Sequence, residues 1–251
     1  MEFNYHTHTT RYHHAQGEDR EYVEAAIRGG MKTLGFSDHA PYLFPFQDYY
    51  SSFRMRVDEL EEYADTVRKL AKEYAKDTRI LCGFELEYYP DYHREEMAFL
   101  KTVHPDYIIM GQHFVGEERS NISPHNTNDA VLTAYVTQVL AGLATGDFLY
   151  VAHPDIPGFR FSKEVCEREY RRLCEGAKRM KVPLEINFLG LRTNRQYPSE
   201  AFFKIAAEVG NDVIFGADAH EAIHVFDAES EEKATKWVQK YGLHLIEELP
   251  L

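Results

Sequence analysis

The chain has 251 residues, 44% of them hydrophobic and 27% charged, which suits one globular domain over residues 1–251 with a large core. Its formal net charge of −13 argues against nucleic acid as a partner, because an acidic surface repels phosphate backbones. No apolar run approaches the roughly 20 residues that span a bilayer, so we expect no membrane partner. The start of the chain lacks a secretory signal and the three cysteines show no paired spacing, which together predict a cytoplasmic location.

Short β-branched or aromatic runs alternate with stretches whose apolar residues recur at helical spacing. In chain order, the expected strands are residues 2–5, 33–36, 79–84, 107–110, 148–151, 183–187 and 212–215. Expected helices between them include residues 58–74, 128–143, 163–180 and 199–209, with Ser162 and Ser199 as N-caps. This alternation predicts an α/β protein whose parallel sheet is either open and doubly wound or closed as a barrel. No glycine-rich nucleotide-binding turn follows a strand.

Each expected strand runs into residues that can bind a metal ion or polarise a substrate. The carboxyl ends of parallel strands meet at one rim of an α/β barrel, so these side chains should converge there. Imidazoles with carboxylates suit Zn²⁺, Mn²⁺ or Fe²⁺, and one ion needs only about three protein ligands. Two ions about 3.5–4 Å apart can clamp an in-line phosphoryl displacement. In strand order the candidates are His6 and His8; Asp38 and His39; Glu85; Gln112 and His113; His153; Glu185 and Asn187; and Asp218 and His220.

Each of these pieces is ambiguous by itself. His6-Thr7-His8 places two rings on one side of an extended segment, but an isolated pair of this kind is weak evidence for a metal. Asp38-His39 could belong to a turn and Glu85 to a salt bridge, and spacing does not separate His13 from His14. The multinuclear interpretation therefore depends on the whole set. The histidines away from the strand ends are expected at the surface or in packing: His93, His104, His125, His224 and His244.

The order and spacing of these motifs resemble the polymerase and histidinol phosphatase (PHP) family over nearly the whole chain. The matching pieces are Tyr5-His6-Thr7-His8-Thr9, His14-Ala15, Phe36-Ser37-Asp38-His39-Ala40, Gly83-Phe84-Glu85, Gly111-Gln112-His113, Ala152-His153, Glu185-Ile186-Asn187, Gly190-Leu191-Arg192, Tyr197-Pro198-Ser199 and Gly216-Ala217-Asp218-Ala219-His220. The resemblance implies a distorted seven-stranded (β/α)7 barrel of the TIM-barrel type. It also implies three divalent metal ions (Zn, Mn and/or Fe) at the C-terminal rim of the strands.

The resemblance also assigns the metal ligands. The first ion would take His6, His8, Glu85 and Asp218; the second Glu85, His113 and His153; and the third His14, His39 and His220. One departure is Arg11-Tyr12-His13, which is bulkier than in many relatives, so that His13 could replace His14.

The activity that the resemblance implies is hydrolysis of a small phosphomonoester, L-histidinol phosphate, in histidine biosynthesis. A hydroxide that bridges the first two ions is the expected nucleophile, with Glu85 and Asp218 in catalytic roles. Arg160, Arg192 and Arg195 follow strands in rim loops and could bind phosphoryl oxygens through guanidinium forks, and we expect Arg160 and Arg192 to assist catalysis. Ordinary surface positions would also explain these arginines. Candidate pocket residues, which core packing would explain equally well, are Tyr42, Phe44, Phe46 and Phe114.

Two other interpretations remain open. Another phosphoesterase of this scaffold could act on phosphotyrosine in proteins or on nucleotide phosphodiesters, although the aromatic segment 42–50 favours a lid over a small substrate. A non-catalytic metal-binding module is the second alternative, but such modules lose ligands that this chain retains. The sequence carries no signal for an oligomeric state or for the general acid.

Overall fold

Two parallel β-sheets form the centre of the computed structural model, which describes residues 1–12, 15–46, 49, 51–120 and 127–251. The first sheet has the order β1 (Phe3–Asn4), β2 (Thr33–His39), β3 (Arg79–Leu86) and β4 (Tyr107–Met110). The second has the order β5 (Leu184–Asn187), β6 (Asp212–Gly216) and β7 (His244–Leu245). All strand pairs are parallel, with β2 and β3 in register from Thr33 opposite Arg79 to His39 opposite Glu85.

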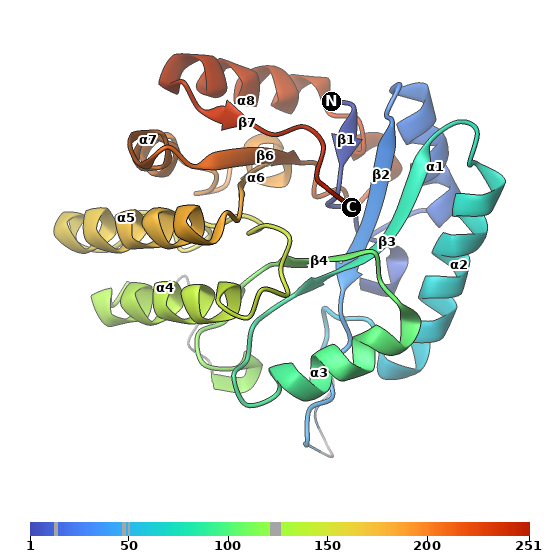
Figure 1. The fold of residues 1–251 in the computed structure, drawn as a ribbon, viewed down its shortest axis with the longest axis horizontal. Helices are drawn as coiled ribbons and strands as arrows, with labels where there is room; N and C mark the ends of the chain where they lie inside the picture. The colour runs from blue at the N-terminus through green and yellow to red at the C-terminus, as the bar shows by residue number, and fades with distance from the viewer. Residues whose placement is uncertain (13–14, 47–48, 50, 121–126) are drawn as a thin grey trace.

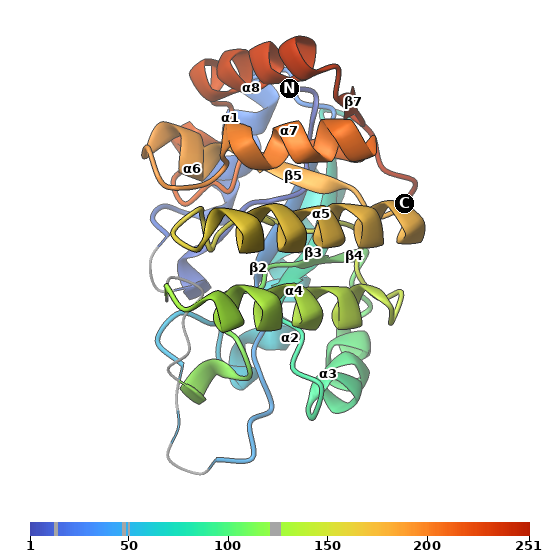
Figure 2. The same ribbon diagram turned by 90° about the vertical axis from the view of Figure 1, so that its left-hand side faces the viewer.

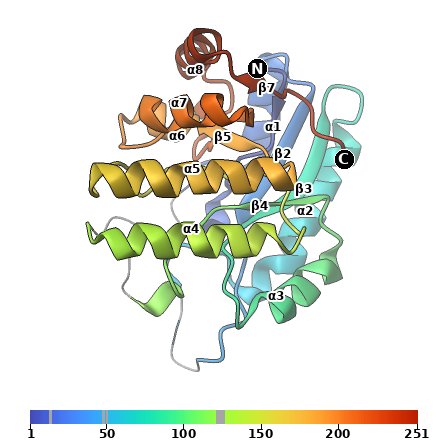
Figure 3. The ribbon, with the colours of Figure 1, turned by 60° about the vertical axis from the view of Figure 1, so that its left-hand side comes forward.

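Helices cover the outer faces of the two sheets. Figure 1 shows α1, α2 and α3 on one side of the strands and α4, α5, α7 and α8 on the other. In Figure 2 these last four lie one below another in front of the strands, and Figure 3 shows the strands running between the two groups. No helix of the described ranges has both the length and the apolar character needed to cross a membrane. The helices are α1 (Asp19–Arg28), α2 (Leu60–Glu73), α3 (His93–Leu100), α4 (Asp129–Leu143), α5 (Lys163–Met180), α6 (Phe188–Arg192), α7 (Glu200–Val209) and α8 (Ala228–Tyr241).

The segment predicted as a fifth strand, residues 148–151, joins the two sheets. The Leu149 N–H donates to the Ile108 carbonyl in β4 at 2.8 Å, and the Val151 N–H donates to the Pro183 carbonyl before β5 at 3.0 Å. Only Val151 meets both neighbours as a β-bridge, because the chain turns at His153, whose φ is +31°. A third single bridge joins Thr7 after β1 to Ala219 after β6. The predicted fifth strand is therefore reduced to one paired residue.

The predicted α/β architecture with a parallel sheet is confirmed, with local differences. α5 has the predicted bounds, and Ser199 caps α7 by accepting a hydrogen bond from the Phe202 N–H at 3.2 Å. Ser162 stands before α5, but its hydroxyl donates to Asp129 at 2.7 Å instead of capping the helix. The structure adds β7 and the helices α1, α3, α6 and α8. The three cysteines are buried and free: Cys82, Cys166 and Cys174.

Candidate metal centre

The predicted strand-end residues meet in a buried cluster at the carboxyl ends of the strands. His6 and His8 follow β1, His39 ends β2, Glu85 lies near the end of β3, and the others follow β4, Val151 and β6: His113, His153, Asp218 and His220. Most of them are almost fully buried, whereas the side chains of His113 and His220 are 22% and 20% exposed. These two rings therefore form the solvent side of the cluster. His13 and His14, one of which was predicted as a ligand, lie outside the described residues.

Glu85 stands at the centre of the cluster and divides its two carboxylate oxygens between two groups of histidines. Its Oε2 lies 3.2 Å from the Nε2 of His6, 3.3 Å from that of His8 and 3.4 Å from that of His39. Its Oε1 lies 3.0 Å from the Nε2 of His153 and 3.7 Å from that of His113. A carboxylate that bridges two cations would divide its oxygens in the same way.

Asp218 joins the Oε2 side of this arrangement. Its Oδ1 lies 3.2 Å from the Nε2 of His8, 3.7 Å from that of His6 and 3.4 Å from the Nδ1 of His220. Asp218 and His153 both have a positive φ, +45° and +31°, which L-residues adopt at a cost of roughly 1–3 kcal/mol. The surrounding structure therefore holds both residues in conformations that aim their side chains at the cluster.

Two glycines leave room for the buried carboxylates. A Cβ atom on Gly111 would lie 1.7 Å from Glu85 Oε1, and one on Gly216 would lie 1.7 Å from Glu185 Oε1. Any larger residue at either position would displace a carboxylate. Steric exclusion therefore accounts for the glycine that begins Gly111-Gln112-His113 and the one that ends β6.

A second group of polar side chains holds the cluster in orientation. Glu185 Oε1 lies 2.7 Å from His6 Nδ1, and Glu87 Oε1 lies 2.8 Å from His113 Nδ1. Each contact is best made with a proton on Nδ1, so that Nε2 is the ring atom available to a cation once it has lost its own proton. The Asn187 amide donates to Glu185 at 2.8 Å and to Asp218 at 3.0 Å. Glu87 was not among the predicted site residues, although it lies two residues after Glu85 and therefore on the same side of the extended chain.

The charges of the cluster suit divalent cations. Burial lowers the pKa of His6, but the nearby carboxylates of Glu185, Asp218 and Glu85 outweigh it and raise that pKa to about 10. Burial raises the pKa of Glu85, but His39 and His6 outweigh it and hold that carboxyl well below its usual range. The Nε2 atoms of His6 and His8 are only 3.2 Å apart, so a proton or a cation must separate their lone pairs. Nitrogen and carboxylate donors in this arrangement fit Zn²⁺, Mn²⁺ or Fe²⁺.

Zinc binding by the metal-free protein at pH 7 is expected to release protons. Since the pKa of His6 is raised to about 10, its ring is protonated at pH 7 and must lose that proton to bind a cation. The pKa of His220 is lowered to about 4, first by burial, so this ring contributes no proton. Calorimetric titration with Zn²⁺ in two buffers of different ionisation enthalpy measures the release. The proton release should decline as the pH rises through about 10, where His6 of the metal-free protein loses its proton. Equal binding heats in both buffers at pH 7 would contradict the predicted release.

The predicted phosphate-binding arginines have different surroundings. Arg160 is exposed and donates to Gln196, and Arg195 donates to the Tyr197 hydroxyl at 2.9 Å. The Tyr197 ring is 5.6 Å from the ring of His153, which places this pair beside the cluster. Arg192 is largely buried and donates to the backbone carbonyls of Ala217 at 2.7 Å and Asp218 at 2.5 Å. These contacts show Arg192 supporting the backbone that presents Asp218; its binding of phosphate stays a prediction.

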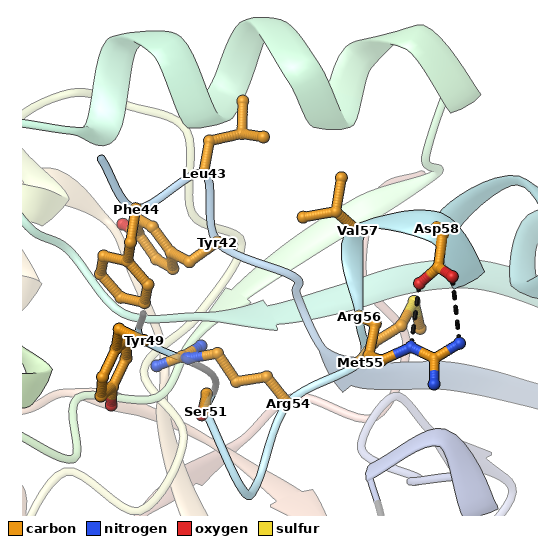
Figure 4. Close-up of a pocket in the computed structure, with 10 residues that line it drawn as sticks. All are labelled: Tyr42, Leu43, Phe44, Tyr49, Ser51, Arg54, Met55, Arg56, Val57 and Asp58. Carbon is orange, nitrogen blue, oxygen red and sulfur yellow. Dashed lines mark hydrogen bonds and ion pairs between the residues drawn. The ribbon is translucent and has the colours of Figure 1, made fainter. Parts of the chain in front are cut away.

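The predicted pocket residues lie at one side of the cluster. Phe114 packs against Phe53 with ring centroids 5.5 Å apart, and the Phe53 ring is also 5.5 Å from that of His39. Tyr42 is buried, donates to the Glu87 carbonyl at 3.0 Å and stacks on Phe44, which stacks in turn on Phe46. A cavity of about 680 Å³ lies along residues 42–44, 49, 51 and 54–58, and none of the lining residues drawn in Figure 4 is a predicted metal ligand. The cavity is therefore separate from the metal-ligand cluster, and it lies beside the cluster because Tyr42, which lines the cavity, contacts Glu87.

Known proteins resemble this chain both in sequence and in fold. A sequence model of the PHP domain matches residues 4–189. The chain is 26% identical over 225 residues to a probable histidinol-phosphatase of Deinococcus radiodurans, covering 86% of this chain and 85% of that protein. It is 26% identical over 248 residues to the histidinol-phosphatase of Bacillus subtilis, covering 86% and 92%. Histidinol phosphate phosphatase from Lactococcus lactis subsp. lactis, solved with zinc, L-histidinol and phosphate, aligns with a TM-score of 0.74 at 20% identity, covering 98% of this chain and 95% of that one, which shows a shared fold.

Proposed function

The chain belongs to the PHP domain family, and we propose on this basis that it is a metal-dependent phosphatase that hydrolyses L-histidinol phosphate. The observation that carries the proposal is the buried Glu85, whose two oxygens serve two groups of histidines brought together from separate strands. The substrate comes from the relatives, since a probable histidinol-phosphatase of Deinococcus radiodurans and the histidinol-phosphatase of Bacillus subtilis match most of this chain.

We propose three divalent ions, Zn, Mn and/or Fe, with Glu85 shared between the first two. His6, His8 and Asp218 would complete the first ligand set, and His113 and His153 the second. Contacts among the described residues support both sets. In the first set, one donor atom each from His6, His8 and Glu85 lies within 4.8 Å of the other two. The same holds for Glu85, His113 and His153 in the second set. The third set would be His39 and His220 with His14. Zinc has the most direct support, since the Lactococcus lactis structure contains it.

The chemistry that bound divalent cations supply is Lewis acidity toward phosphoryl oxygens and a lowered pKa of water. The chain's own residues orient this site. Glu185 and Glu87 fix the ring orientations of His6 and His113, and Asn187 with Arg192 holds Asp218. We propose that Arg160 and Arg195, at the rim beside Tyr197, turn from their present partners to bind the phosphoryl group. Tyr42 and Phe114 would border the alcohol part of the substrate.

We also propose that the two sheets are parts of one distorted seven-stranded barrel in a single domain of residues 1–251. The support is the set of single bridges at Val151 and between Thr7 and Ala219, which link the sheets at both seams. The candidate ligands extend from His6 to Asp218 and His220, so the site needs chain segments from both sheets.

The substrate assignment is tested by steady-state kinetics on zinc-loaded and manganese-loaded protein. We expect kcat/KM for L-histidinol phosphate to exceed that for a phosphotyrosine peptide and for a dinucleotide by more than about 100-fold, because a site that pairs the polar groups of its substrate rejects analogues that lack them. Phosphotyrosine hydrolysis at an equal or higher kcat/KM would favour the rival phosphoesterase interpretation. Zinc binding without hydrolysis of any of the three would instead favour a non-catalytic metal-binding module.

A further inference from the structure

A buried cluster of three charged residues, Arg54, Glu87 and Glu118, lies beside the candidate metal centre, and the proposed function gives a role only to Glu87. Arg54 Nη2 lies 2.6 Å from Glu87 Oε2, and Arg54 Nε donates to Glu118 Oε2 at 2.6 Å. The three side chains are 1%, 0% and 1% exposed. Burying charged groups is unfavourable unless each is paired in good geometry, and a single cation here serves two carboxylates. The buried carboxylates of Glu87 and Glu118 therefore both depend on the position of Arg54 for charge compensation.

Glu87 connects this cluster to a candidate metal ligand. One carboxylate oxygen pairs with Arg54, and the other lies 2.8 Å from the Nδ1 of His113. The opposite nitrogen of that ring, Nε2, lies 3.7 Å from Glu85 Oε1, on the side where the second ion is proposed. Arg54, Glu87 and His113 thus form a continuous line of contacts that ends at the metal centre.

Arg54 also holds the chain segment that borders the cavity of Figure 4, which we call the rim segment (residues 40–46, 49 and 51–58). Its Nη1 donates to the Ala40 carbonyl at 3.3 Å, and its guanidinium lies over the rings of Phe53 and Tyr42, at 4.7 Å and 5.2 Å from their centroids. Figure 4 shows this guanidinium directed toward Tyr42 and Tyr49 and away from the Arg56–Asp58 pair. Tyr49 donates to the remaining oxygen of Glu118 at 2.5 Å. One guanidinium therefore fixes both the rim segment and Glu87.

We propose that Arg54 is a positioning residue that orients the metal ligand His113 through Glu87, and that it thereby couples the conformation of the rim segment to metal binding. The proposal rests on the metal site of the proposed function. Arg54 uses Nη2 for Glu87, Nε for Glu118 and Nη1 for Ala40, so a lysine ammonium in its place keeps the charge but loses this geometry.

The test measures zinc dissociation constants by competition with a chelating dye in Glu87→Gln, Arg54→Gln, the double variant and Arg54→Lys. An amide at position 87 must turn its NH₂ group toward one of two donors, Arg54 or His113 Nδ1. We expect each Gln variant to weaken the binding of one zinc ion by roughly 10–100-fold, the usual cost of losing a carboxylate that supports a ligating histidine. The double variant should bind no more weakly than Glu87→Gln, because Arg54 acts through Glu87. Arg54→Lys should be intermediate.

The matched control is Arg20→Gln, which breaks the exposed Arg20–Glu73 ion pair on α1 and α2 and should leave zinc binding unchanged. Zinc binding by Glu87→Gln as tight as wild type, or fully additive losses in the double variant, would overturn the proposal. If Arg54→Gln does not fold, the zinc affinities of Glu87→Gln and Arg54→Lys test the proposal instead. Glu87→Gln keeps the Arg54–Glu118 pair, and Arg54→Lys keeps a positive charge between the two carboxylates. A wild-type chain that binds no zinc would contradict the proposed function itself, whereas tight wild-type binding with unaffected variants contradicts only the role of Arg54.

Discussion

Replacing Glu85 with Gln is expected to reduce kcat/KM for L-histidinol phosphate by at least about 10³-fold, because bound cations contribute several kcal/mol to stabilising a phosphoryl-transfer transition state. Glu85 contacts His6, His8 and His39 through one oxygen and His113 and His153 through the other. An amide keeps the shape of the side chain but offers one neutral oxygen and an NH₂ group that cannot bind a cation. Both proposed metal sites that share this residue should therefore weaken together.

Elemental analysis after dialysis should show that Glu85→Gln retains fewer metal ions per chain than the wild-type protein. Glu61→Gln, an exposed position on α2, is a matched control in which both activity and metal content should be unchanged. Circular dichroism separates loss of the metal centre from loss of the fold. A Glu85→Gln protein with wild-type metal content and full activity would contradict a shared two-ion centre.

Removing the metal ions with a chelator is expected to abolish activity and to lower Tm by roughly 8–16 °C. An ion present at about 1,000 times its dissociation constant stabilises the folded chain by roughly 4 kcal/mol, and each kcal/mol shifts Tm by roughly 2–4 °C in a protein of this size. Cation loss also leaves Glu85, Asp218 and Glu185 close together and buried, with protons on the histidines as the remaining compensation. Scanning calorimetry with chelator, and again after zinc is added back, measures both the loss and its reversal.

Glu85→Gln provides a control for the calorimetric experiment. Because this variant is expected to bind fewer ions, chelation should lower its Tm by less than it lowers that of the wild-type protein. Manganese and iron added back in place of zinc would rank the three candidate metals by the Tm and activity that each restores. An identical Tm with and without chelator, in a protein shown by elemental analysis to contain metal beforehand, would contradict a structural contribution from the ions.

The positions of the candidate ligands in the chain follow from local rules, and the sequence was sufficient to find them. Residues at or just after the ends of parallel strands reach the same edge of a sheet, so the sequence alone groups His6, His39, Glu85, His153 and Asp218. The same local rules would have found Glu87, two residues after Glu85 and on the same side of the strand. The strand at residues 148–151 was only partly predictable, since its pairing stops where His153 takes a positive φ.

The partners of each side chain were decided by the tertiary structure. Arg54 is 33 positions from Glu87 and 64 from Glu118, and no periodicity of sheet or helix relates a loop arginine to either carboxylate. Arg192, whose binding of phosphate stays a prediction, donates from α6 to the carbonyls of Ala217 and Asp218, and no local pattern in the sequence indicates these two contacts. The sequence by itself determined which residues gather at the strand ends, because strand direction and the two-residue repeat are local properties. Only the folded chain decided how the oxygens of Glu85 divide among the histidines, because that division depends on contacts between segments far apart in sequence.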